Sequence, residues 1–155
     1  MALLCAVALT IFVAEARIPV PIAGVKLGLA NIITLYTMAL LGKREAALVL
    51  TARIILGSMF SGSMSALIFS LAGGISAYAV MALTIGAFPP NLLWVVSIFG
   101  AIAHNAGQLT AAALITRTPG LFTYGLVLLI AAVITGAFTG VSAQYLIKAL
   151  PLSKF

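Results

Sequence analysis

The sequence predicts an all-α membrane protein, a bundle of six transmembrane helices that forms one integral membrane domain over residues 1–155. Hydrophobic residues make up 64% of the chain and charged residues only 6%, whereas about a quarter of a typical soluble domain is charged. The mean hydropathy is +1.29. The apolar residues also fall into six runs, which are separated by short segments rich in Gly, Pro and basic residues.

Each run is assigned a helix because its ends coincide with helix-breaking or charged residues. The expected helices cover about residues 1–14, 27–41, 45–60, 64–85, 92–116 and 121–150. The first run is short for a span of roughly 17–25 residues, which suggests that a few further residues precede it. Glu45 opens the third helix, where its charge suits the positive end of the helix dipole.

Charge and cysteine content exclude several classes of protein. The eight Lys and Arg residues outnumber the two acidic residues, which gives a net charge of +6. These basic residues are scattered or lie at the ends of runs, so they are typical of membrane anchors and do not form a nucleic-acid-binding patch. The single cysteine, Cys5, has no partner for an internal disulfide. The first run lacks a basic leader and a cleavage site, so we expect it to stay as a membrane helix.

The basic residues between the runs also predict an orientation. With both chain ends inside, four basic residues lie on the cytoplasmic side and three on the outer side. The cytoplasmic set is Lys43, Arg44, Lys148 and Lys154, and the outer set is Arg17, Lys26 and Arg117. Because basic residues favour the cytoplasmic side, we expect a multi-pass protein of the inner (cytoplasmic) membrane with the N- and C-termini inside.

One segment, EARIPVPIAGVKLGLAN at residues 15–31, is too polar and too interrupted to span a bilayer. It holds three of the ten charged residues, two prolines and two glycines. We predict that it forms the lid and rim of a small-molecule site on the outer side.

Polar residues inside the expected spans support such a site. Arg53 lies near the middle of the third span, where a guanidinium costs at least about 2.5–3.5 kcal/mol and needs an anion, carbonyl groups or water. His104 and Gln108 are four residues apart and share a face of the fifth helix, with Asn105 beside them. Asn31 lies at a similar level. Donors dominate the set, so the expected ligand is anionic or carbonyl-rich.

Two interpretations of these residues remain open. Arg53 could pair with Glu15, while the amides could serve as hydrogen-bonding glue between helices. Ionisable residues inside a membrane usually mark function, which favours ligand binding for Arg53 and His104 and leaves Asn105 and Gln108 undecided. The sequence has no Asp, no phosphate-binding GxxxxGK[ST] loop and no nucleophile elbow, and its lone His does not suggest a metal site. These features predict a binding protein with no cofactor or metal, and not an enzyme.

Small residues spaced four apart form seams on three helices, and such seams let helix backbones approach closely. For the fourth helix (Ser70-xxx-Gly74, Gly73-xxx-Ala77) and the sixth (Ala132-xxx-Gly136-xxx-Gly140), packing within the bundle is favoured. For Ala2-xxx-Ala6 on the first helix, packing against another protein is also an option.

Four segments in order also carry a resemblance to a known family. They are IPVPIAGVKLGLANIITL, ALLGKREAALVLTARIILGSMFSGS, FSLAGGISAYAVM and SIFGAIAHNAGQLTAAAL. Over essentially its whole length, the chain resembles the heptaprenyl diphosphate synthase component I family, also called the Gx transporter family. That family is in turn similar to the S components of energy-coupling factor (ECF) transporters. Those are six-helix proteins that bind a vitamin or precursor beneath the loop between the first two helices.

The resemblance implies roles for individual residues. Ala2 and Ala6 would face a partner subunit. The ligand-facing residues would be Glu15, Lys26, Asn31, Arg53, His104, Asn105 and Gln108. One departure is Glu15-Ala16, where the family more often has Glu-Ser.

Two functions follow as hypotheses. The first is an S-type subunit that binds a small anionic vitamin or isoprenoid-related precursor for uptake, energised by ECF-type transmembrane and ATPase subunits. The second is a membrane accessory subunit of an isoprenoid (heptaprenyl) diphosphate or quinone biosynthetic enzyme, with a soluble prenyl synthase as its partner.

Overall fold

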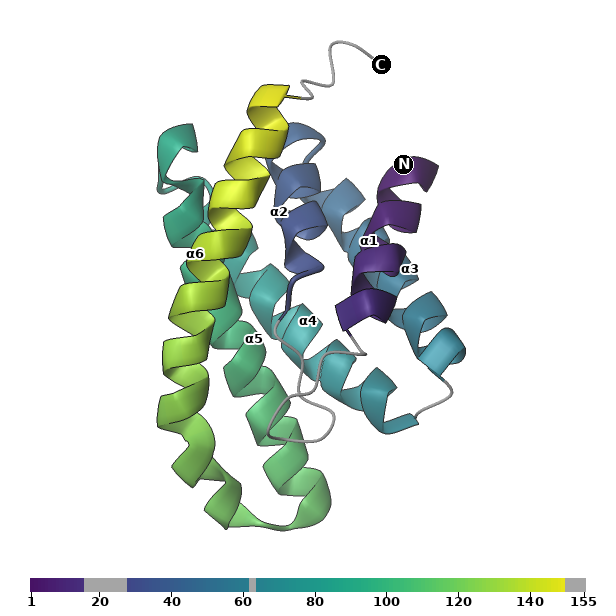
Figure 1. The fold of residues 1–155 in the computed structure, drawn as a ribbon, viewed down its shortest axis with the longest axis vertical. Coiled ribbons are helices and arrows are strands. Elements are labelled where there is room, and N and C mark those ends of the chain that lie inside the picture. Colours follow the sequence, from purple (N-terminus) through teal and green to yellow (C-terminus); the bar gives the residue numbers. More distant parts are fainter. Residues whose placement is uncertain (16–27, 62–63, 150–155) are drawn as a thin grey trace.

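The computed structural model of the protein describes residues 1–15, 28–61 and 64–149, and within these ranges it is all-helical, as predicted (Figure 1). Two short 3-10 helices, η1 (Pro90–Leu92) and η2 (Pro119–Tyr124), precede the last two α-helices. The α-helices of the described part are α1 (Ala2–Glu15), α2 (Asn31–Leu40), α3 (Lys43–Ser61), α4 (Met64–Thr84), α5 (Leu93–Thr116) and α6 (Gly125–Ala149).

Two helix starts differ from the expected positions, each for a local reason. The second helix was expected from about residue 27, but α2 begins at Asn31. Gly28 has a φ of +80°, in the left-handed region, and its carbonyl accepts a hydrogen bond from the N–H of Asn31 at 2.9 Å. A turn therefore precedes the helix. The sixth helix was expected from about residue 121, but η2 occupies that position and α6 begins at Gly125.

Three segments are long and apolar enough to cross a membrane, namely Leu67–Thr84, Pro90–Thr116 and Pro119–Ala149. These three segments indicate a membrane protein. That the chain crosses the membrane six times remains a prediction. The remaining helices fall short in different ways. α1 and α2 are apolar but have only 14 and 10 residues, and the 19-residue α3 contains Arg53 and a charged first turn.

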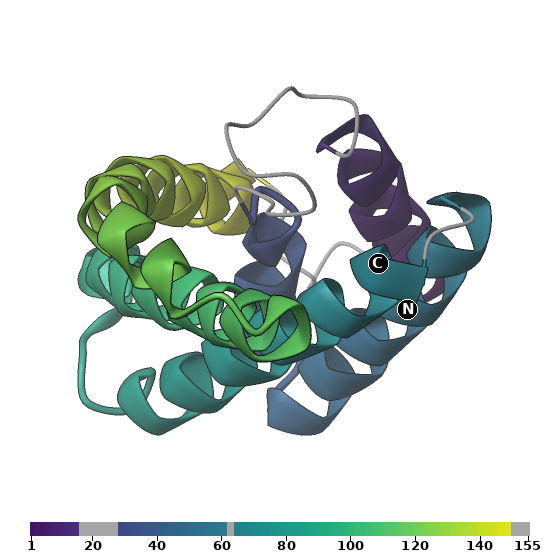
Figure 2. The same ribbon diagram turned by 90° about the horizontal axis from the view of Figure 1, so that it is seen from below.

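The short helix α2 lies inside the bundle. Seen from below, α5 and α6 form one side, α1 and α3 form the other, and α2 lies between them (Figure 2). Seven of the ten residues of α2 are buried. Leu35 and Met38 of α2 pack in a core cluster with Met81 of α4 and Leu93 and Val96 of α5. A helix that neighbouring helices cover in this way does not have to match the thickness of the bilayer by itself.

The small-residue seam of α6 packs inside the bundle, against α5. A Cβ atom at Gly136 would lie 2.7 Å from the Cα of Ile98, and one at Gly140 would lie 2.4 Å from the Cα of Trp94. Between these two contacts, the hydroxyls of Ser97 and Thr139 are 2.7 Å apart and hydrogen-bonded. The absence of side chains thus allows two backbones to touch, which is the internal packing that the sequence favoured.

The bundle has two distinct ends. The start of α1, the end of α2, the start of α3 and the end of α6 lie at the upper end in Figure 1. η2 lies at the opposite, lower end, and the end of α1 and the turn before α2 are on the side that faces it. In the predicted orientation, the upper end is cytoplasmic.

Candidate functional site

Arg53 is the centre of a polar cluster that joins three helices. Only 3% of its surface is exposed. Its Nη2 donates a hydrogen bond to Oδ1 of Asn31 on α2 at 3.2 Å. Its guanidinium carbon lies 5.9 Å from the centre of the Phe12 ring of α1, within the range of a cation–π interaction. The guanidinium is thus held by contacts to α1 and α2.

Glu15 is the second charged residue of this cluster and is 4% exposed. Its Oε1 accepts a hydrogen bond from the backbone N–H of Gly28, which ties the end of α1 to the turn before α2. The charge of Glu15 also acts on Arg53 through space. The hydrogen bond of the Arg53 guanidinium goes to Asn31, however, so the carboxylate is a nearby counter-charge and Asn31 is the direct partner.

A small cavity lies between these residues. Its walls come from α1, the turn before α2, α3, α4 and α5, and its lining residues are Phe12, Glu15, Gly28, Arg53, Ile54, Ser70 and His104. Its volume is about 10 Å³, which is about the space of a single water molecule. Nε of Arg53 and Oγ of Ser70 are buried and have no hydrogen-bond partner among the described residues. Because buried polar atoms are normally satisfied, the cavity has the donors to hold a small polar group.

His104 and Gln108 reach the cluster from α5, as their shared face predicts. Their side chains are 5% and 0% exposed. A Cβ atom at Gly73 of α4 would lie 2.7 Å from Cγ of Gln108 and 2.9 Å from Cε1 of His104, and one at Gly28 would lie 3.4 Å from Cδ2 of His104. His104 therefore fits between two glycines, and it lines the same cavity as Arg53.

Asn105 lies apart from the cavity beside Arg53. Asn105 donates a hydrogen bond from Nδ2 to the carbonyl of Leu128 on α6 at 2.9 Å. It lines a separate cavity of about 170 Å³ between α5, η2 and α6, so its described contact is one of helix packing. Lys26 falls outside the described residues. Ala2 and Ala6 are exposed on α1, so this face is open to a partner.

Four residues of the cluster were not predicted to belong to it. Ser70 and Gly73 were assigned to a packing seam, and the SLAGG motif was a signal that could have pointed to them. The position of Gly28 beside His104 depends on a left-handed turn that a single glycine does not specify. Phe12 gave no signal at all, because one aromatic residue in an apolar run does not stand out.

A family model described as heptaprenyl diphosphate synthase component I matches residues 4–146. The chain belongs to this family. No curated protein and no solved structure matches it. The matched range includes Arg53, Asn31 and all residues that line the small cavity beside them. The family description names one component of a synthase, in agreement with the prediction that this chain is not itself an enzyme.

A methyl group at Gly73 tests the contact between α4 and the His104–Gln108 face. Gly73→Ala should displace both side chains, because the new Cβ would lie within 3 Å of each. We expect the purified Gly73→Ala protein to unfold at a lower temperature than the unaltered chain, while its helical circular dichroism spectrum stays unchanged.

The matched control is Gly74→Ala on the same helix. It brings the same gain in helix propensity, but its Cβ meets the flexible ends of Ile54 and Leu50, at 2.8 and 3.2 Å. An equal fall in unfolding temperature in both variants would show that a general shift of α4 is responsible, rather than the contact with His104 and Gln108.

Proposed function

We propose that this chain is a non-catalytic membrane subunit of an isoprenoid diphosphate-forming enzyme, and that the Arg53 cluster binds a small anionic group. The observation that carries the site is the burial of Arg53 beside Asn31, Glu15 and His104, with its Nε free of any described partner. The family description supports a synthase as the partner.

The chemistry of the cluster suits a phosphate or carboxylate. A guanidinium presents a planar fork of donors that matches both groups, and Ser70 adds a hydroxyl to the same cavity. The cavity is about 10 Å³ in volume, so a diphosphate can enter only if the walls move apart. The bond from Gly28 N–H to Glu15 closes the cavity where α1 ends, and an incoming anion would repel that carboxylate. Opening at this bond is therefore the expected route of entry.

Co-purification tests the proposed partner. The full chain, tagged and extracted in mild detergent from its native membrane, should bring down a soluble prenyl synthase. The untagged strain serves as the control. Addition of the purified chain in lipid vesicles should then change the rate or the product length of that synthase. Failure to recover a synthase, together with no effect on its activity, contradicts the proposal.

A second candidate function, an S-type uptake subunit, is favoured by one specific observation. Ala2 and Ala6 are exposed and four residues apart on α1, which leaves a small-residue face for a partner helix. In this case the same purification recovers ATPase subunits, and Ala6→Trp removes them from the complex. Thr10→Trp, one turn further along the helix and also exposed, should have a smaller effect.

A further inference from the structure

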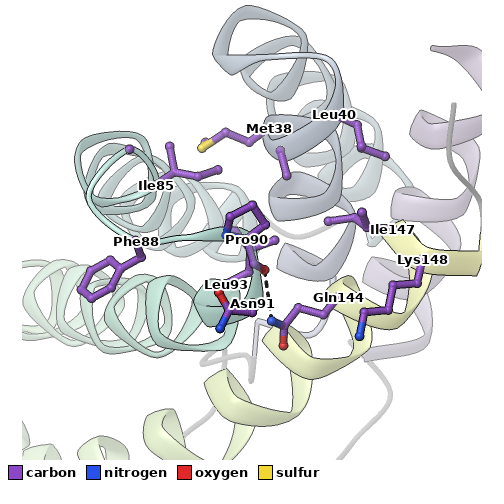
Figure 3. A pocket seen from close by; sticks show the side chains of 12 residues that line it. Met38, Leu40, Ile85, Phe88, Pro90, Asn91, Leu93, Gln144, Ile147 and Lys148 are labelled. Atoms are coloured by element: carbon purple, nitrogen blue, oxygen red, sulfur yellow. Dashed lines mark hydrogen bonds between the residues drawn. The ribbon is translucent and has the colours of Figure 1, made fainter. Parts of the chain in front are cut away.

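A second and much larger cavity lies at the upper end of the bundle, opposite the end toward which Glu15 and Gly28 point. Its volume is about 630 Å³, within the range of roughly 300–1,000 Å³ for pockets that hold small molecules. The ends of α2 and α6 border it, together with the segment that follows α4, η1 and the first residue of α5 (Figure 3). We call it the upper pocket.

The floor and walls of the upper pocket are apolar. Met38 and Leu93 are each 4% exposed and belong to the core cluster of the bundle. Ile85, Phe88 and Ile147 line the pocket above them and are only partly buried. An apolar chain that entered the pocket would cover these side chains and remove their surface from water, which is favourable in proportion to the area buried.

The polar groups of the upper pocket are confined to one side. Figure 3 shows the ends of Asn91, Gln144 and Lys148 along one edge, opposite Met38 and Leu40. Nε2 of Gln144 donates to the carbonyl of Pro90 at 3.2 Å, which fixes α6 to η1. Lys148 supplies a positive charge, and no carboxylate is found among the described lining residues.

We propose that the upper pocket binds an amphiphile with an apolar tail and an anionic, phosphate-type end. The tail lies over Met38 and Leu93, and the anionic end contacts Lys148. This inference concerns a site separate from the Arg53 cluster and does not depend on the function proposed for it. Two sources of such a ligand share this chemistry, an isoprenoid diphosphate and a membrane phospholipid, and the experiment below distinguishes them.

The test uses the full chain in nanodiscs of zwitterionic phosphatidylcholine, with ligand binding measured by native mass spectrometry. The probes are farnesyl diphosphate, farnesol, inorganic diphosphate and phosphatidylglycerol. Farnesyl diphosphate should bind more tightly than farnesol. Lys148→Glu should weaken the binding of farnesyl diphosphate by about tenfold, the effect of one lost charge-assisted contact, and leave farnesol unchanged. Arg44→Ala, at an exposed cation of the same end that does not line the pocket, is the matched control and should leave both unchanged.

A second variant keeps the inference testable if Lys148→Glu fails to fold. Ile147→Trp should narrow the pocket and weaken the binding of farnesyl diphosphate and farnesol alike. If phosphatidylglycerol competes with farnesyl diphosphate and its binding also depends on Lys148, the site is assigned to a membrane lipid. If phosphatidylglycerol does not compete, the site is assigned to an isoprenoid. The proposal is overturned if Lys148→Glu and Ile147→Trp both bind farnesyl diphosphate as the unaltered chain does, or if Arg44→Ala weakens binding as much as Lys148→Glu.

A variant of Arg53 distinguishes binding at the Arg53 cluster from binding in the upper pocket. Arg53→Met should abolish stabilisation by inorganic diphosphate, whereas farnesol, which has no anionic group, should bind to Arg53→Met as it binds to the unaltered chain. The proposal for one site can therefore be contradicted while the proposal for the other stands.

Discussion

Replacement of Arg53 by methionine is expected to lower the free energy of unfolding by about 1 kcal/mol and to abolish stabilisation of the protein by inorganic diphosphate. The substitution keeps an unbranched apolar stem but removes the hydrogen bond to Asn31 and the cation–π contact with Phe12. It also leaves the carboxylate of Glu15 buried without its nearby positive charge. Unfolding by SDS in mixed micelles measures the first effect, and a thermal shift with diphosphate measures the second.

Two opposing contributions decide the size of this effect. Removal of a buried guanidinium relieves an insertion cost of at least about 2.5–3.5 kcal/mol on the more lenient scale. The loss of a partner from a buried charged group costs about 3–5 kcal/mol, because the remaining charge is uncompensated. The second contribution exceeds the first only while Glu15 keeps its carboxylate. Neutralisation of Glu15 should therefore reverse most of the destabilisation.

The double variant Arg53→Met with Glu15→Gln separates folding from binding. Glutamine keeps an oxygen that can accept the N–H of Gly28, so the tie between α1 and the turn before α2 is preserved. We expect the double variant to regain most of the lost stability without any response to diphosphate. If Arg53→Met alone is stable and still responds to diphosphate, Arg53 is a packing residue and the proposed site is wrong.

The helices could be located from the sequence because each apolar run ends at residues with a clear local effect. The turn at Gly42 and the prolines at positions 89, 90 and 119 break the helical pattern whatever the tertiary structure. The buried position of α2 could not be predicted in this way. A ten-residue apolar helix covered by its neighbours and one that faces lipid have the same composition.

The candidate site was predictable only where polar residues stand out against an apolar background. Arg53 and His104 were recognisable because an ionisable group within a span is costly, and they line one cavity in the structure. Asn105 was grouped with them by its position next to His104, yet adjacent helical residues point in different directions, and it contacts α6. The upper pocket left no trace in the sequence, because apolar residues such as Met38 and Ile85 look the same in a pocket as in the lipid-facing surface.

Substitution of Gly140 by alanine is expected to cause the largest loss of stability, about 3 kcal/mol. The new Cβ would lie 2.4 Å from the Cα of Trp94 and 2.7 Å from the Cβ of Ser97. Overpacking typically costs about 1–3 kcal/mol, and the upper value applies here because the closest atom belongs to the backbone of α5 and cannot rotate away. The helix propensity gained by replacing glycine recovers only about 1 kcal/mol of that amount, but separation of α5 from α6 would also strain the hydrogen bond between Ser97 and Thr139.

Gly125→Ala provides the matched control, because it makes the same chemical change at the start of the same helix. A Cβ atom at Gly125 would meet only Cδ2 of Leu109, at an ordinary contact distance of 3.7 Å. This variant should be as stable as the unaltered protein or slightly more stable, and both should be compared by unfolding in SDS mixed micelles. Equal stability of Gly140→Ala and Gly125→Ala would mean that α5 and α6 do not pack backbone to backbone. The small-residue seam of α6 would then be free to contact another protein, as the corresponding seam of α1 is.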